Sequence, residues 1–266
     1  MSRDFELFLF AREPTVVREA TAAGVDGVVI DWERFDKHER QSDADTQISG
    51  DTADDLARVR AATKARVICR INPFGAHTGN ELEQALDAGA DEVLLPMVRS
   101  ADEVDATLEL ARSRCGVGIL VETDEAVQGA AGLGTLPIAR AYVGLNDLAI
   151  ARNSASIFDA VADGTVERIR DAFQVPFGFA GLTRPERGVP VPCRLLIAEM
   201  VRLGCSFSFL RRSYRRDVAR GEQRDAIVAI HDALDTAAAR KGSAVDRDRR
   251  LLERTIAAGS QPVVSG

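Results

Sequence analysis

Residues 92–121, EVLLPMVRSADEVDATLELARSRCGVGILV, hold a helix-length stretch between two short apolar runs. The runs are Glu92–Val98 and Gly116–Val121, and each is short enough to be one strand. The apolar residues between them recur every three or four positions, as on one face of a helix: Val104, Leu108 and Ala111. Apolar strands joined by a crossover helix pair in parallel and are buried on both faces. This stretch therefore predicts a parallel sheet covered by helices.

The same alternation continues along most of the chain. Six more strand-like runs are Phe5–Phe10, Gly27–Ile30, Arg66–Ile71, Ala141–Leu145, Pro176–Gly181 and Ser206–Leu210. Gly24, Gly89 and Gly204 fall where helices should end, as C-terminal caps often do. Eight strand–helix units predict a closed (β/α)₈ TIM barrel, and the 266 residues are close to its usual size.

A doubly wound open sheet is the competing prediction, but no G-x-G-x-x-G follows the first strand. We therefore predict an α/β protein with one barrel domain over residues 1–240 and a C-terminal helix and tail. Residues 241–266 are charged and then small and polar. They are interpreted as either a tail or an arm that packs on a neighbouring subunit.

Composition excludes several classes of protein. Hydrophobic residues make up 45% and charged residues 28% of the chain, which is typical of a globular enzyme. The net charge of −7 argues against a general nucleic-acid-binding protein. No apolar run resembles a signal peptide or a membrane span, so a cytoplasmic protein is expected. The four cysteines are scattered without C-x-x-C spacing, which indicates neither zinc nor a dithiol motif.

Candidate catalytic residues lie where the predicted strands end, because barrel active sites form at that face. Acids and arginines gather there, whereas the opposite strand ends look plain. The polar residues at this rim are Asp31, Glu33, Arg70, Asn72, Glu122, Asn146, Asp147, Arg184, Arg211 and Arg212. Two carboxylates from adjacent strands, with Asn and Arg nearby, suit Mg²⁺ or Mn²⁺. The carboxylate and keto oxygens of a 2-oxo acid would fill open positions on such a cation.

Five stretches carry a family resemblance. They are GVDGVVIDWE (24–33), VICRINP (67–73), GADEVLLPMVRSADEV (89–104), ILVET (119–123) and YVGLNDLA (142–149). In this order and spacing they resemble the HpcH/HpaI aldolase/citrate lyase β-subunit family of phosphoenolpyruvate/pyruvate-binding barrels. The resemblance implies a metal-dependent lyase that acts on a 2-oxo acid. It also implies a homo-oligomer, commonly a trimer or hexamer.

The resemblance assigns roles to individual residues. It implies that Glu122 and Asp147 are the metal ligands and that Arg70 holds the keto oxygen and steadies the enolate. Asn72 completes the R-x-N setting of that arginine. The substrate carboxylate is expected to accept hydrogen bonds from the backbone amides of Gly144, Leu145, Asn146 and Asp147.

The acid–base residue is left open by a departure from the family. The aldolase branch has a histidine directly after the strand-two glutamate, whereas this chain has Arg34. The citrate lyase branch has an aspartate there and a lysine further along, which residues 33–41 match only loosely. Asp31 and Glu33 remain candidates, one to hold a metal-bound water and the other to pair with Arg34. His38 is a further candidate base, although a loop histidine is more often only solvated.

Four arginines follow the eighth predicted strand: Arg211, Arg212, Arg215 and Arg216. Loops in this position often bind phosphate in barrels, and arginine binds anions in a bidentate manner. Together with Arg184 they suggest a substrate with a second anionic group. The alternative is a solvated run that pairs with acids such as Asp217.

The leading hypothesis is a class II aldolase that joins or splits a pyruvate or oxaloacetate enolate and an aldehyde. A Schiff-base aldolase is disfavoured, because none of the three lysines lies on a predicted strand. One alternative is citrate-lyase-like cleavage or hydrolysis of an acyl-CoA. Another is a catalytically silent barrel that binds a 2-oxo acid, since the histidine of the family's dyad is missing.

Overall fold

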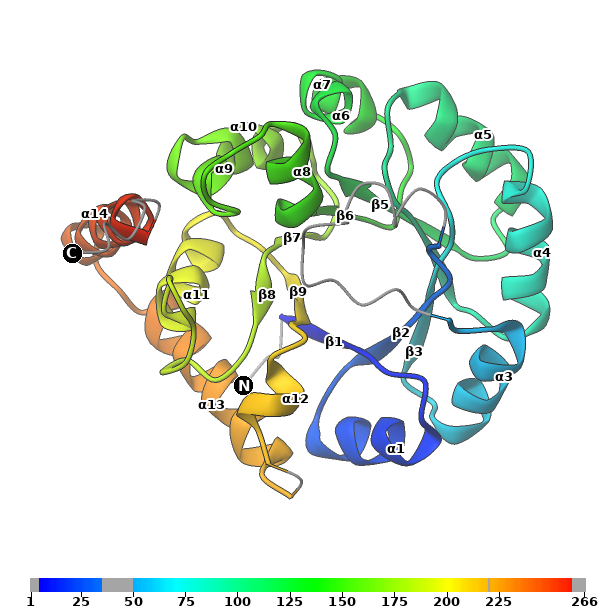
Figure 1. Ribbon diagram of the computed structural model, residues 1–266, viewed down its shortest axis with the longest axis horizontal. Helices are drawn as coiled ribbons and strands as arrows, with labels where there is room; N and C mark the ends of the chain where they lie inside the picture. Colours follow the sequence, from blue (N-terminus) through cyan, green and yellow to red (C-terminus); the bar gives the residue numbers. More distant parts are fainter. Residues whose placement is uncertain (1–4, 35–49, 220, 260–266) are drawn as a thin grey trace, which may run out of the picture.

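A computed structural model describes residues 5–34, 50–219 and 221–259. Its strands form one parallel sheet in the order β7-β6-β5-β4-β3-β2-β1-β9-β8, wrapped into a barrel (Figure 1). The strands are β1 (Glu6–Phe10), β2 (Gly27–Asp31), β3 (Arg66–Arg70), β4 (Glu92–Leu95), β5 (Gly116–Val121), β6 (Arg140–Val143), β7 (Phe177–Phe179), β8 (Gly181–Leu182) and β9 (Phe207–Leu210). The predicted α/β barrel is confirmed.

The seventh predicted strand, Pro176–Gly181, forms two short strands, β7 and β8, and the barrel nearly closes through them. Ala180 separates β7 from β8 and has a φ of 50°, a left-handed conformation that breaks the strand. β7 pairs with β6, whereas β8 pairs with β9. Ser206 N donates to Phe177 O at 3.0 Å, and Ser208 Oγ donates to Ala180 O at 2.6 Å. These bonds connect the two ends of the sheet.

Helices surround the sheet (Figure 1). They are α1 (Pro14–Ala23), α3 (Ala53–Ala62), α4 (Thr78–Asp87), α5 (Ala101–Ala111), α6 (Asp124–Gln128), α7 (Ala130–Leu133), α8 (Leu145–Ala151), α9 (Asp159–Ala162), α10 (Thr165–Ala172), α11 (Cys193–Arg202), α12 (Tyr214–Asp217), α13 (Gln223–Ala238) and α14 (Gly242–Gly259). The predicted glycine ends are confirmed, since Gly24, Gly89 and Gly204 have φ of 111°, 95° and 62°. No helix among the described residues is long and apolar enough to cross a membrane.

The C-terminal helix α14 lies outside the ring of barrel helices and packs on α11 (Figure 1). Leu252 and Ile256 form the apolar side of α14 and are buried. Arg249 pairs with Glu199 of α11, which is itself buried. The described part of the C-terminal region is therefore helical and attached to its own barrel.

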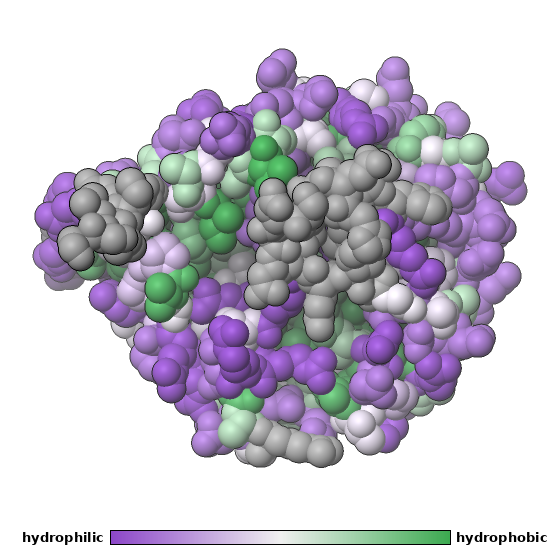
Figure 2. All heavy atoms as spheres, viewed as in Figure 1, coloured by the Kyte–Doolittle hydropathy of each residue, from purple (hydrophilic) through white to green (hydrophobic). Residues whose placement is uncertain are grey.

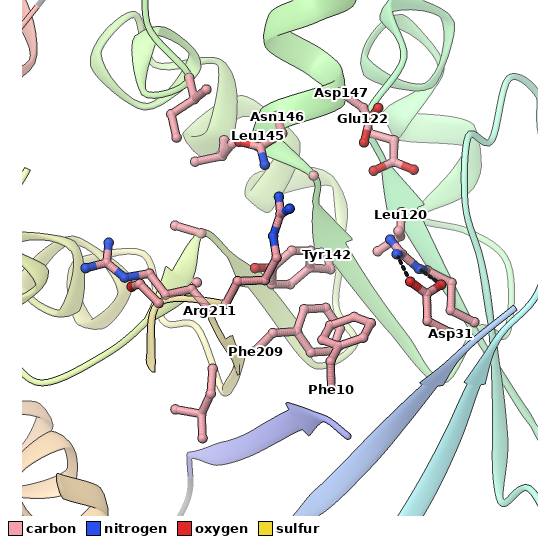
Figure 3. A pocket seen from close by; sticks show the side chains of 18 of the residues that line it. Phe10, Asp31, Leu120, Glu122, Tyr142, Leu145, Asn146, Asp147, Phe209 and Arg211 are labelled. Atoms are coloured by element: carbon pink, nitrogen blue, oxygen red, sulfur yellow. Dashed lines mark hydrogen bonds and ion pairs between the residues drawn. The ribbon is translucent and has the colours of Figure 1, made fainter. Parts of the chain in front are cut away.

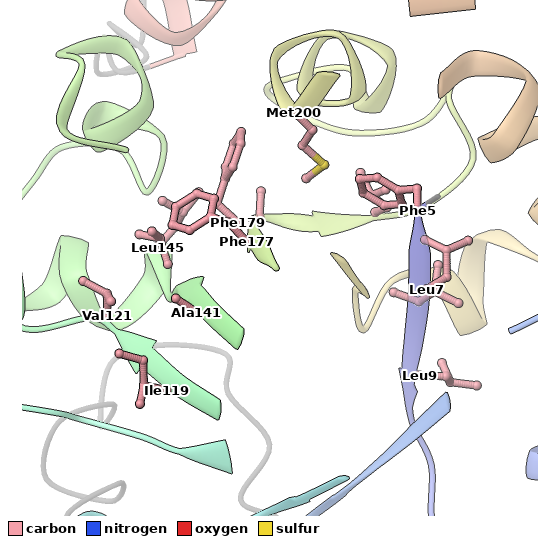
Figure 4. Packing of buried hydrophobic residues seen from close by; sticks show 14 of the residues in the cluster. Phe5, Leu7, Leu9, Ile119, Val121, Ala141, Leu145, Phe177, Phe179 and Met200 are labelled. Carbon is pink, nitrogen blue, oxygen red and sulfur yellow. The ribbon is translucent and has the colours of Figure 1, made fainter. Parts of the chain in front are cut away.

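Strand residues alternate between the helix-covered outer face and the barrel interior. On the outer face, Leu7, Leu9, Ile119 and Val121 belong to the larger core cluster, and Met200 of α11 points toward the sheet (Figure 4). The interior holds a second apolar cluster: Phe8, Val29, Ile68, Leu94, Leu120, Tyr142, Phe207 and Phe209. This middle layer separates the two open ends of the barrel.

A charged lower layer lies at the strand starts, so the prediction that these ends are plain was wrong. It consists of Glu6, Arg66, Glu92 and Arg140, the first residues of β1, β3, β4 and β6. Arg140 Nε donates to Glu92 Oε1 at 2.7 Å, and Arg140 Nη1 lies 3.3 Å from Glu6 Oε2. Arg66 Nη1 lies 3.1 Å from the same Glu6 oxygen. The lower end of the barrel is thus occupied by paired charges.

Candidate active site

A cavity of about 660 Å³ opens at the ends of the strands, the face where the sequence placed the site. The aromatic rings of Phe10, Tyr142 and Phe209 line it together with Leu120 (Figure 3). Four carboxylates and five arginines also line it: Asp31, Asp51, Glu122, Asp147, Arg12, Arg70, Arg211, Arg212 and Arg215. Figure 3 shows Glu122 and Asp147 at one side and Arg211 at the other. The cavity therefore has two chemically different ends.

Arg70 is the last residue of β3 and is held by the two strand-two acids. Its Nε and Nη2 donate to Asp31 Oδ1 and Oδ2 at 2.9 and 2.7 Å, and its Nη1 lies 3.1 Å from Glu33 Oε2. Burial would lower the pKa of Arg70, but Asp31 and Glu33 outweigh burial and raise it. Arg70 therefore presents a fixed positive charge to the cavity. Glu33 is 1% exposed and pairs with Arg70 behind the cavity wall.

Arg34, which occupies the position of the family's histidine, is exposed. Its Nη2 donates to Asp51 O at 2.6 Å, and its backbone N donates to Asn72 Oδ1 at 2.8 Å. The strand-two acids form ion pairs with Arg70, and the expected pair of one of them with Arg34 stays a prediction. Arg34 therefore braces the loops beside the site.

Asp51 is a lining residue that the sequence interpretation missed. Its Oδ2 accepts from Asp31 N at 3.0 Å, and its Oδ1 lies 3.4 Å from Arg12 Nη1. Asp51 does not end a strand, because it precedes α3 and its N-cap Thr52. A search limited to strand ends could not find it.

Asn72 supports the site without lining the described cavity, so the expectation that it binds substrate is not supported by its position. It is 4% exposed, and its Nδ2 donates to Glu81 Oε1 at 2.6 Å. Its backbone N donates to Glu81 Oε2 at 3.0 Å. Because Asn72 Oδ1 also accepts from Arg34 N, Asn72 connects the end of β3 to α4 and to the segment that follows β2.

Glu122 follows β5 and is buried, at 2% exposure. Its Oε1 accepts from Met97 N at 2.9 Å, and Met97 has a φ of 52°. A Cβ on Gly144 would lie 2.1 Å from Glu122 Oε2, so glycine is required beside this carboxylate. Burial and the charges of Asp147 and Glu33 raise the pKa of Glu122 to about 8, despite Arg70.

Two neighbouring carboxylates, one of them buried, suit a divalent cation, which would offset the burial of Glu122 and the repulsion between the two charges. Asp147 lies in the first turn of α8 and lines the cavity beside Glu122. In the described part of the chain, no group of three or more His, Cys, Asp or Glu side chains is arranged to hold a metal. These two oxygen donors therefore fit a hard cation only if substrate and water supply its other ligands.

Gly144, Leu145 and Asn146 also line the cavity, at the start of α8. The first amides of a helix lack partners within the helix, so they can bind an anion. Gly144 N already donates to Val121 O at 3.2 Å, so its amide is not open to a substrate as expected. The position of Leu145 and Asn146 is compatible with the predicted role in binding the substrate carboxylate, which remains a prediction.

The arginines predicted to bind a second anionic group divide into those that line the cavity and one that does not. Arg211, Arg212 and Arg215 line the cavity. Arg184 does not line it, contrary to expectation, because its Nη2 is 2.8 Å from Glu222 Oε2 and its Nη1 is 3.8 Å from Glu186 Oε1.

The remaining histidine and lysine predictions concern residues that are outside this cavity or outside the described chain. His38 and Lys37 lie outside the described residues. Neither Lys64 nor Lys241 lines the cavity, so no described lysine is placed to form a Schiff base there.

Comparisons with known proteins agree with this barrel. The family model described as HpcH/HpaI aldolase/citrate lyase matches residues 4–151. Comparison with curated proteins gave no significant match.

Three solved structures share the fold. The citrate synthase SbnG has 17% identity and a TM-score of 0.59, over 78% of this chain and 84% of that chain. An HpcH/HpaI aldolase/citrate lyase family protein from Burkholderia cenocepacia J2315 has 15% identity and a TM-score of 0.61, over 88% and 95%. RipC from Yersinia pestis has 14% identity and a TM-score of 0.57, over 92% and 100%.

Proposed function

Because this chain belongs to the HpcH/HpaI aldolase/citrate lyase family, we propose that it is a divalent-metal-dependent carbon–carbon lyase of the class II aldolase type. Its nucleophile would be the enolate of pyruvate or oxaloacetate, and its partner an aldehyde. The observation that carries this proposal is the carboxylate pair of buried Glu122 and half-buried Asp147, which line the same cavity as Arg70.

Mg²⁺ or Mn²⁺ held by Glu122 and Asp147 would act as a Lewis acid toward the oxygens of the 2-oxo acid. Arg70 would stabilise the negative charge that develops on the keto oxygen. Its bonds to Asp31 and Glu33 fix the guanidinium before substrate arrives, so little reorganisation is needed. The amides at the start of α8 would hold the substrate carboxylate.

Proton transfer is assigned to Asp31 acting through a water. Asp31 lines the cavity and ends β2, whereas Glu33 does not line the cavity. Both Asp31 oxygens already accept hydrogen bonds from Arg70. A water positioned by this carboxylate would carry the proton.

One observation favours a second candidate function, a barrel that binds a 2-oxo acid without turnover. Arg34 replaces the family's histidine, and its side chain bonds Asp51 O. In that case the oxo acid would bind in the presence of metal, yet its methyl protons would not exchange.

The test is proton NMR of pyruvate in D₂O with the purified chain, with Mg²⁺ or Mn²⁺ and again with chelator. Metal-dependent loss of the methyl signal is expected, because formation of the enolate exchanges these protons. Glu122→Gln and Asp147→Asn should abolish the exchange, whereas Glu222→Gln, outside the cavity, should retain it. Binding of pyruvate without exchange would instead support the silent barrel.

A further inference from the structure

The cavity is larger than a three-carbon acid requires. Its volume of about 660 Å³ lies within the range of about 300–1,000 Å³ that is typical of sites for drug-sized ligands. Figure 3 shows the rings of Phe10, Tyr142 and Phe209 between the carboxylate end and the side occupied by Arg211. A substrate bound at Glu122 and Asp147 therefore has room to extend toward Arg211.

The charged residues that line the cavity differ between its two ends. Arg70 pairs with Asp31, and Arg12 lies 3.4 Å from Asp51. A divalent cation would compensate the remaining carboxylates, Glu122 and Asp147. Arg211 and Arg215 line the other end of the cavity, after β9, where the acid beside Arg211 is Asp217, at 4.0 Å. A ligand group with more than one negative charge would balance them.

Arg211 is the arginine best placed to receive such a group. It lines the cavity, and its buried Nε has no hydrogen-bond partner in the described part of the chain. Its Nη2 is 4.0 Å from Asp217 Oδ2, a long ion-pair distance. Asp217 Oδ2 also accepts from Thr183 Oγ1 at 2.8 Å and Ser213 Oγ at 3.0 Å, so this carboxylate is shared. A buried donor without a partner is costly, and a ligand oxygen would satisfy it.

Arg215 adds a second, exposed guanidinium at the mouth of the cavity. The face seen in Figure 2 is hydrophilic over α12, which carries Arg215 and Arg216. Arg216 is on the same short helix but does not line the cavity, and its side chain is 83% exposed. It is therefore a matched control for Arg215.

We propose that Arg211 and Arg215 bind a phosphate group at the far end of the partner substrate. This inference rests on the proposed function, because it extends the same cavity from the 2-oxo acid to its partner. A phosphate dianion offers three oxygens to several guanidinium groups, whereas a carboxylate offers two. The phosphate would belong either to a phosphorylated aldehyde or to an acyl-CoA.

Isothermal titration calorimetry with glycerol 3-phosphate tests the subsite separately from the reaction. Glycerol and 4-hydroxybutyrate, which lack phosphate, are the matched ligands. Glycerol 3-phosphate should bind at least about tenfold more tightly than 4-hydroxybutyrate. Arg211→Gln combined with Arg215→Gln should weaken it by about tenfold or more, and Arg215→Gln alone tests the exposed residue if the double variant misfolds. Arg216→Gln should bind within about twofold of the unaltered chain.

Equal affinities for glycerol 3-phosphate and 4-hydroxybutyrate would overturn the phosphate subsite, as would no binding or unchanged binding in the arginine variants. Competition distinguishes the two supporting outcomes. Coenzyme A would displace glycerol 3-phosphate at much lower concentration if the phosphate belongs to an acyl-CoA, and glyceraldehyde 3-phosphate would do so if it belongs to an aldehyde. Pyruvate exchange without any acceptor reports on the proposed function alone, so the two ideas can fail independently.

Discussion

The two ends of the barrel interior contain the same types of residue but use them differently. At the lower end, Glu6, Arg66, Glu92 and Arg140 pair with one another. At the upper end, Arg70 pairs with Asp31 and Glu33, while Glu122 lies beside another carboxylate, Asp147. The lower charges fill their space, whereas the upper ones line a cavity of about 660 Å³. Charge in this barrel interior is therefore structural where paired side chains fill the space, and available for ligands where it lines the cavity.

A glycine makes room for a charged side chain at each end of the barrel. A Cβ on Gly118 would lie 2.8 Å from Glu92 Oε1 and 2.9 Å from Arg140 Cγ, so Gly118 makes room for a buried ion pair. A Cβ on Gly144 would crowd Glu122, a carboxylate that faces the cavity. Each glycine thus protects the position of a charged side chain.

The largest expected effect is on stability, at the lower end. Arg140 is 2% exposed, stacks against Phe8 and Phe207 with centroid distances of 4.6 and 4.8 Å, and pairs with Glu92. Arg140→Met should lower the free energy of unfolding by about 3–5 kcal/mol, because it leaves Glu92 buried and uncompensated.

Urea unfolding measures this effect, and the double change Arg140→Met with Glu92→Met should recover much of the loss. Unfolding of the single variant at the same urea concentration as the unaltered chain would show that the lower pair is not structural.

The next effect is on activity, at the upper end. Gly144→Ala would place a methyl group 2.1 Å from Glu122 Oε2 and displace the carboxylate. A shift of about 1 Å in a catalytic group can cost about 100-fold in rate, so pyruvate exchange should fall by about that factor. The comparison variant is Gly132→Ala, since a Cβ there would meet nothing within 4 Å. Full activity of Gly144→Ala would mean that Glu122 does not need its present position.

The smallest effect is a pH dependence of stability in the metal-free chain. The pKa of Glu122 rises from 4.5 to about 8 on folding, so the folded chain retains a proton that the unfolded chain releases. The resulting stability is complete below about pH 4.5 and is lost as pH rises through about 8. Glu122→Gln should flatten this contribution and stabilise the chain at pH 8 by about 0.5–2 kcal/mol.

Thermal unfolding between pH 5 and pH 8.5 measures this contribution as the difference between the two chains. If that difference does not change with pH, Glu122 does not titrate in this window.

The charged residues at the upper end of the barrel could be predicted from the sequence, because they end or directly follow strands and belong to a family pattern. Glu122 and Arg70 could be placed from the apolar runs that precede them. The lower layer could not be predicted, because Glu92 on β4 and Arg140 on β6 meet across an interval of 48 residues. The predicted sixth strand began at Ala141, whereas β6 begins at Arg140, so this arginine was left outside the barrel.

Other residues at the upper end could not be predicted from the positions where strands end. Arg184 follows β8 closely yet turns to Glu222, and Arg215 of α12 lines the cavity instead. Asp51 reaches the cavity from the segment before α3. Side-chain direction at these positions depends on tertiary contacts that no local pattern encodes.

The most direct test of the difference between the two ends is Mn²⁺ binding followed by electron paramagnetic resonance. One tightly bound Mn²⁺ per chain is predicted, with loss of binding in Glu122→Gln and in Asp147→Asn. Glu92→Gln, which alters a carboxylate of the lower layer, should bind Mn²⁺ as the unaltered chain does. Equal loss in all three variants, or retention in all three, would contradict the assignment of the upper pair to a metal and of the lower layer to the fold.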